Sequence, residues 1–282
     1  MQDTVHRPPL SVFPIWKWDR AIDYDGTDDF VSTATGRVSG LSLGGTTIAV
    51  VVITDSTSNY RTAIAARTSG GTYGWTWFTN TFTAGQLSLY DGTTESLFSA
   101  SLLSGEPYLL VVGKASGSAI PRFHVFRFST KAWTHANGSA AIGDGTSPGT
   151  GGTMRFGIDV GGTDPFDGVI LMAAVWNTNF AANDAEVEQL QRRGVNPFAW
   201  MGTRSGNLAA LWTLRGTRWT DWVGSAHESS RTGTTYRSLS TQVRDVPVDF
   251  IGPLFLPALG ELAVPSAVDP VGSRMLLMGV GR

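Results

Sequence analysis

The sequence contains no cysteine and few charged residues. Without cysteine, none of the 282 residues can form a disulfide, a thiolate zinc site or a cysteine nucleophile. Only 16% of the residues are charged and the net charge is −2. The chain therefore has no general electrostatic attraction to nucleic acid or to an anionic membrane surface. No apolar run reaches the ~18 residues of a membrane span. The start, MQDTVHRPPL, also lacks the basic and apolar regions of a secretion signal. We therefore expect no nucleic-acid partner, no membrane insertion and no signal peptide.

Patterns typical of β-strands fill most of the chain. Leu87 and Leu89 alternate with polar residues, as do Met154 and Phe156, which is typical of strands with one buried face. Three other runs are apolar on both faces and predict central strands, at residues 48–53, 108–112 and 169–176. The alternation resumes over residues 208–222. The sequence therefore predicts an all-β, two-sheet antiparallel sandwich.

One short helix is predicted at residues 184–193. Asn183 is a candidate N-cap, and Glu186 stands where a capping box would place it. Val187 and Leu190 give an apolar pair on one helical face, and Gly194 is placed to end the helix.

The two ends of the chain differ from its middle. Residues 246–282 contain five prolines, which exclude a helix or a central strand, yet the segment is too apolar for a solvated linker. It either wraps its own domain or docks on another subunit. We predict an N-terminal arm at 1–19, a sandwich domain at 20–245 and a C-terminal arm at 246–282. The candidate subunit-contact residues are Phe250, Leu254, Phe255, Leu256 and Leu259.

Several segments, in order, resemble the laminin-G/concanavalin-like jelly roll. Residues 21–31 are similar to its opening strand–turn–strand, residues 105–112 to its middle strand, and residues 166–177 to its late strand, which a helix follows. Residues 194–198 resemble copies of this domain in tailed-phage virion proteins. The resemblance implies a jelly-roll sandwich, a scaffold used for sugar binding, protein contacts and, in some branches, glycan hydrolysis.

The residues that catalysis would need are missing from the sequence. The hydrolytic branch of this superfamily carries a Glu-x-Asp-x-x-Glu strand, and none of the six glutamates begins one. The four histidines form no His-Glu-x-x-His pair, and no Gly-x-Ser-x-Gly elbow is present. His124 reads as a strand residue rather than a base. We therefore predict no catalytic residues and no enzyme activity.

Two kinds of binding site remain as candidates. Asp25 and Asp28 lie in an acidic turn that suits Ca²⁺, the only candidate cofactor, although an Asx-turn beside Gly26 explains the same residues. Two tryptophan pairs are candidates for stacking on sugar rings, with core packing as the alternative: Trp75 with Trp77, and Trp219 with Trp222.

The leading hypothesis is a non-enzymatic structural component of a phage-like virion, either a capsid decoration protein or a minor tail protein. Its partners would be other virion subunits or copies of itself, and it could also adhere to a host-surface glycan. The alternative is a carbohydrate-binding module that recognises cell-surface polysaccharide. A glycoside hydrolase is the third reading.

Overall fold

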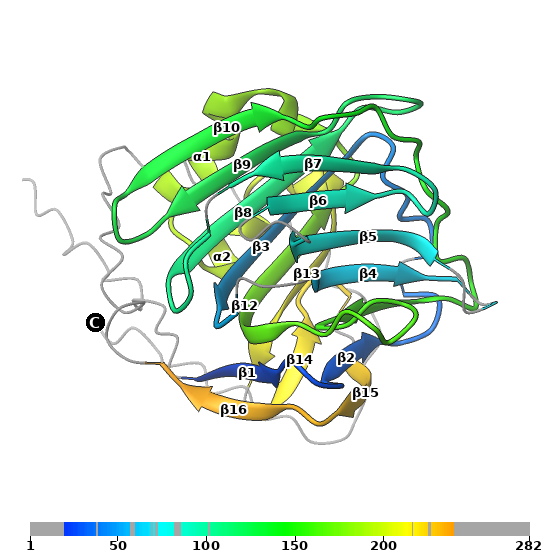
Figure 1. Ribbon diagram of the computed structural model, residues 1–282, viewed down its shortest axis with the longest axis vertical. Helices are drawn as coiled ribbons and strands as arrows, with labels where there is room; N and C mark the ends of the chain where they lie inside the picture. Colours follow the sequence, from blue (N-terminus) through cyan, green and yellow to red (C-terminus); the bar gives the residue numbers. More distant parts are fainter. Residues whose placement is uncertain are drawn as a thin grey trace, which may run out of the picture. The chain divides into compact units, whose positions relative to one another are not determined.

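The computed structural model describes residues 20–239, except 38, 57–59, 69, 71–72, 82–85, 101, 216 and 225–226. Two antiparallel β-sheets form a sandwich, as the sequence predicts (Figure 1). No helix in this described part is long and apolar enough to cross a membrane. The predicted domain boundaries at 19/20 and 245/246 stay predictions, because both arms lie outside the described residues.

The larger sheet has nine strands. Seven of them follow the order β10-β9-β8-β3-β12-β1-β16, while β13 pairs with both β12 and β14. The predicted central strands are the neighbours β8, β3 and β12, and the sheet continues past the helices through β13 as expected. The bounds are β1 (Arg20–Asp25), β3 (Thr46–Thr54), β8 (Pro107–Lys114), β9 (Arg122–Arg127), β10 (Ala132–Asn137), β12 (Asp167–Trp176), β13 (Leu208–Arg215), β14 (Arg218–Asp221) and β16 (Thr235–Ser238).

The smaller sheet has seven strands in the order β15-β2-β11-β4-β5-β6-β7. Its strands follow the one-sided apolar pattern, and Leu87, Leu89, Met154 and Phe156 are all buried, as predicted. The bounds are β2 (Phe30–Thr33), β4 (Arg61–Arg67), β5 (Tyr73–Asn80), β6 (Gln86–Tyr90), β7 (Glu95–Ser99), β11 (Thr153–Phe156) and β15 (Glu228–Thr232).

Apolar side chains form two separate clusters. The first lies between the sheets and includes Val50, Trp77 and Phe156. The second joins the outer face of the nine-stranded sheet to the helices, and here Val51 and Trp200 belong to one buried cluster. Because the central strands have a cluster on each side, the middle residues of each strand are apolar on both faces. The helical segments are η1 (Phe180–Ala182), α1 (Asp184–Arg192), α2 (Pro197–Met201) and η2 (Ser205–Asn207).

The predicted helix is α1, and its N-cap is confirmed. The Asn183 side chain accepts a hydrogen bond from Ala185 N, at 3.1 Å, and Gly194 follows the helix with a φ of +100°. The capping box is wrong, since the Glu186 carboxylate pairs with Arg204 instead of turning back to the cap. The five-residue helix α2 was not predicted.

Candidate functional site

Trp75 and Trp77 do not form a sugar-stacking platform, so this prediction is corrected. Both side chains are fully buried between the sheets, and Trp75 Nε1 donates to the Leu41 carbonyl at 3.0 Å. The alternation of β5 directs these two rings inward and turns Thr76 and Phe78 to the outer face. The alternative, core packing, is what the structure contains.

The second tryptophan pair is divided between core and surface. Trp219 is buried against Phe156, with ring centroids 5.4 Å apart, so its predicted sugar contact is also wrong. Trp222 is partly buried and its Nε1 donates to Thr213 Oγ1 at 2.8 Å. Its ring meets the edge of Phe198, an exposed side chain on α2. Of the four predicted tryptophans, Trp222 alone lies near the surface, and the ring it contacts there is Phe198 rather than Trp219.

The acidic turn between β1 and β2 contains the predicted Asx-turn. Asp25 Oδ1 accepts from Thr27 N at 2.8 Å, and Asp29 Oδ2 accepts from Asp25 N at 2.8 Å. One carboxylate oxygen from each of Asp25, Asp28 and Asp29 lies within 4.8 Å of the others. Burial and the neighbouring carboxylates raise the pKa of Asp29. A Ca²⁺ site at Asp25 and Asp28 stays a prediction.

The predicted subunit-contact residues lie outside the described residues. This applies to all five of them, Phe250, Leu254, Phe255, Leu256 and Leu259. Their role therefore stays a prediction.

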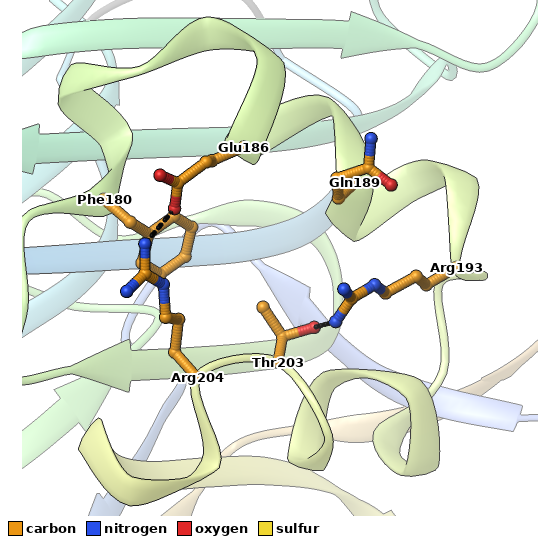
Figure 2. Close-up of a pocket in the computed structure, with 6 residues that line it drawn as sticks. All are labelled: Phe180, Glu186, Gln189, Arg193, Thr203 and Arg204. Atoms are coloured by element: carbon orange, nitrogen blue, oxygen red, sulfur yellow. Dashed lines mark hydrogen bonds and ion pairs between the residues drawn. The ribbon is translucent and has the colours of Figure 1, made fainter. Parts of the chain in front are cut away.

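A small pocket lies beside α1 and opposite the segment between α2 and η2 (Figure 2). Its volume is about 120 Å³, and its lining is Phe180, Glu186, Gln189, Arg193, Thr203 and Arg204. The polar lining groups pair with one another: Arg204 donates to Glu186 at 2.5 Å, and Arg193 to Thr203 Oγ1 at 3.5 Å. Pockets that hold organic ligands are larger, roughly 300 Å³ or more, so we place no substrate here.

The outer face of the seven-stranded sheet brings two arginines together. Ala66 of β4 and Met154 of β11 are opposite each other and point into the core. Because strand side chains alternate, the residues that follow them, Arg67 and Arg155, point outward. Arg67 pairs with Thr153, so Arg155 is its diagonal neighbour on the same face.

These two arginines have no carboxylate partner within ion-pair distance in the described part of the chain. Burial and the charge of Arg67 lower the pKa of Arg155, while Asp159 acts on it only from a longer range. The Nε atoms of Arg67 and Arg155 are both buried without a hydrogen-bond partner. The Arg155 guanidinium lies 4.7 Å from the centroid of the Phe30 ring, which holds it in place. Two adjacent cations that make no ion pair among the described residues suit an anionic ligand.

Hydroxyl and aromatic side chains occupy other outward positions of the same sheet. The hydroxyls of Thr62, Thr76 and Ser88 are buried and have no hydrogen-bond partner. The register sets Thr76 opposite Tyr90, and Phe78 opposite Ser88 and Thr62. Thr62, Thr76 and Ser88 are fully buried, so the groups of this face that can meet a ligand are the partly exposed Arg67 and Arg155 with the neighbouring rings of Phe30 and Tyr90.

A second polar cluster, which the sequence did not reveal, lies on the other sheet. His124 is a strand residue on β9, as expected, and the register sets it opposite His135 of β10. Their Nδ1 atoms are 2.8 Å apart, and Asp184 of α1 lies beside them. Burial lowers the pKa of His124 to about 4. Strand register brings the two histidines together and the packing of α1 adds Asp184, and no pattern in a single sequence indicates either.

Comparison with known proteins supports the fold. No family model and no curated protein matches the sequence. The structure is similar to a "putative carbohydrate binding protein" from Bacteroides ovatus, with a TM-score of 0.52 and 17% identity. The match covers 79% of this chain but only 61% of that protein, so the chain spans about three fifths of its length.

Two weaker similarities are to a heptameric pentraxin from Limulus polyphemus and to the LG1–3 region of the laminin α2 chain. The pentraxin has a TM-score of 0.49 and 16% identity, over 64% of this chain and 85% of that one. The laminin region has a TM-score of 0.41 and 10% identity, over 57% of this chain and 32% of that one. The strand order and the similarity to the Bacteroides ovatus protein support the fold, a two-sheet antiparallel jelly-roll sandwich.

Proposed function

We propose that the chain is a non-enzymatic adhesion domain that binds an anionic cell-surface glycan on the outer face of its seven-stranded sheet. The observation that carries this proposal is the adjacent pair Arg67 and Arg155, which has no counter-charge within ion-pair distance among the described residues. A uronate, sialate or sulfate group would supply that charge, and guanidinium groups bind such anions with two parallel hydrogen bonds. The Bacteroides ovatus protein, to which this chain is similar in structure, is described as carbohydrate binding, which supports the same class of ligand.

The two outer faces of the sandwich support this placement. Helices α1 and α2 cover the outer face of the nine-stranded sheet with apolar contacts. The seven-stranded sheet instead presents Arg155, Phe30 and Tyr90 on its outer face. An aromatic ring beside a cation binds both the apolar face and the acidic group of a sugar.

The test compares an acidic and a neutral polysaccharide. Biolayer interferometry with immobilised alginate, a polyuronate, should show binding that immobilised dextran does not. Arg155→Gln should weaken alginate binding roughly ten- to hundredfold, because a hydrogen bond to a charged group contributes about 1.5–3 kcal/mol. Arg204→Gln, on the helix side, is the matched control and should bind as the unaltered chain does. Equal binding by Arg155→Gln, or no preference for alginate, would contradict the proposal.

We further propose that this domain acts within a phage-like virion, as a capsid decoration or minor tail protein. Two sequence features support this setting: the resemblance of residues 194–198 to virion proteins, and the apolar, proline-containing residues 246–282. Buried apolar side chains contribute roughly 1.5–3 kcal/mol each, so Phe250, Leu254 and Phe255 would attach strongly to a neighbouring subunit.

Removal of residues 246–282 tests the virion setting. The shortened chain should keep its melting transition and stay soluble, but should no longer assemble when followed by light scattering. A shortened chain that aggregates or loses its melting transition would show that the segment belongs to its own domain, and the subunit-contact proposal would be wrong.

A further inference from the structure

The second polar cluster lies where the β9–β10 edge of the nine-stranded sheet meets the start of α1. His124 is completely buried, His135 is 17% exposed and Asp184 is 37% exposed. His124 Nδ1 and His135 Nδ1 are 2.8 Å apart, and His124 Nδ1 is 3.7 Å from Asp184 Oδ1. One ligating atom from each of the three residues lies within 4.8 Å of the others.

The contacts of the two Nε2 atoms determine which nitrogen of each ring carries the hydrogen and which has a free lone pair. His124 Nε2 lies 2.7 Å from the Ala181 carbonyl oxygen, which only accepts, so Nε2 carries the hydrogen. His135 Nε2 faces Glu188 Oε1 at 3.5 Å, and a carboxylate also accepts. With both hydrogens on Nε2, the two Nδ1 atoms direct lone pairs toward each other. A cation between the two nitrogens, or a hydrogen on His135 Nδ1 instead of Nε2, relieves this contact.

We propose that His124, His135 and Asp184 bind a transition-metal ion of the Zn²⁺ class, with water completing the coordination. Two imidazole nitrogens and one carboxylate are a ligand set of this class, whereas Ca²⁺ and Mg²⁺ prefer oxygen ligands. Tetrahedral Zn²⁺ with bonds of about 2.0–2.1 Å sets its ligand atoms roughly 3.3 Å apart. The observed separations of 2.8 and 3.7 Å lie on either side of that value.

The surrounding groups are of the kind that orient metal ligands. The Ala181 carbonyl holds the His124 ring, and Glu188 faces the outer nitrogen of His135, as hydrogen-bond acceptors do behind ligating histidines. Arg122 Nε donates to Asp184 Oδ1 at 2.6 Å, which leaves that oxygen a second lone pair for the ion. Because the ligands come from β9, β10 and α1, the metal would join the sheet edge to the helix.

The test uses the full chain without a histidine tag. After removal of EDTA, equimolar or excess ZnCl₂ should raise the melting temperature by on the order of 5 °C, since an ion that binds only the folded state stabilises it. Isothermal titration calorimetry should show one ion per chain. His135→Asn, a change at the most accessible ring, should lower the zinc affinity at least tenfold and remove the melting shift.

Two further variants complete the test. His227→Asn, which alters a histidine outside the cluster, is the matched control and should respond to zinc as the unaltered chain does. Glu188→Gln should keep one site but weaken it roughly ten- to hundredfold, as loss of a positioning residue does. An unchanged melting temperature with zinc, or equal responses from His135→Asn and the unaltered chain, would overturn the proposal and leave a shared proton as the cation between the rings. Neither result depends on glycan binding.

Discussion

The two outer faces of the sandwich differ in composition and in what covers them. Val51, Leu109 and Leu171 lie in the apolar cluster that includes the helices on the nine-stranded sheet. On the seven-stranded sheet, the outward positions carry Arg67, Arg155 and small hydroxyl side chains. A sheet face that is apolar in sequence requires a covering layer, whereas the partly exposed Arg67 and Arg155 on the other face can meet a ligand. The outer face of the nine-stranded sheet therefore stabilises the fold, and the outer face of the seven-stranded sheet is the candidate binding face.

The largest effect is expected from a charge on the covered face. Val51→Asp should prevent folding, because an unpaired buried carboxylate costs several kcal/mol. Thr153→Asp places the same charge on the outer face of the seven-stranded sheet, beside Arg67, and should fold with nearly unchanged melting. Circular dichroism melts of both variants measure the difference. A soluble Val51→Asp chain with unchanged melting would break the distinction between the two faces.

The covering layer itself depends on α2. Trp200 is fully buried, its ring centroid is 5.9 Å from that of Trp176, and its Nε1 donates to the Leu190 carbonyl at 3.3 Å. Trp200→Ala should lower the free energy of unfolding by roughly 3–5 kcal/mol. Phe198 of the same helix is 56% exposed, so Phe198→Ala should cost less than about 1 kcal/mol. Urea denaturation compares the two, and equal losses would show that α2 does not cover the sheet.

On the seven-stranded side, a buried carboxylate joins the loops by hydrogen bonds. Asp91, between β6 and β7, accepts from Thr93 N at 2.8 Å, Thr94 N at 2.7 Å and Gly143 N at 2.5 Å. Burial opposes its ionisation, but these hydrogen bonds prevail and lower the pKa of Asp91. Asp91→Ala should cost about 1–3 kcal/mol at pH 7 through the donors left unpaired.

The pH dependence of Asp91 has a definite sign. Its folded pKa lies below its unfolded value, so the carboxylate stabilises the fold above a pH of about 4 and this contribution is lost as the pH falls through the folded pKa. The stability difference between the unaltered chain and Asp91→Ala should therefore shrink on acidification below about pH 4. Urea denaturation at pH 7 and pH 3 measures it, and a constant difference would contradict the assignment.

The smallest expected effect is at the N-cap of α1. Asn183→Ala should cost on the order of 1 kcal/mol, the usual loss when a cap oxygen is removed. Glu186→Gln should change stability less, because Glu186 pairs with Arg204 at the surface rather than with the cap. Thermal melts distinguish the two. Equal effects would mean that the capping box operates after all.

The sequence predicts the fold well because buried strand positions show a periodic pattern of apolar residues. Apolar runs on both faces identified β3, β8 and β12, and alternation identified β6 and β11. The helix α2 was missed because five residues, Pro197–Met201, are too short for a helical period to appear. Strands β15 and β16 were missed because most of their side chains are exposed and polar.

The candidate sites were predicted less well, because they depend on which strands are neighbours. Alternation showed that Trp75 and Trp77 share a face, and the structure turns that face inward. Arg67 and Arg155 come from distant strands, and only the β4–β11 register makes them neighbours. Neither residue belongs to a motif, so no local pattern could have indicated the pair.

Arginine side-chain NMR tests the central claim most directly. Alginate oligosaccharide would be titrated into the ¹⁵N-labelled chain while the Nε–Hε signals of Arg67, Arg155 and Arg204 are followed. We expect the Arg67 and Arg155 signals to shift together with one dissociation constant, because one anion contacts both, while the Arg204 signal stays in place. Unmoved Arg67 and Arg155 signals, or equal shifts at Arg204, would contradict a glycan site on the seven-stranded sheet.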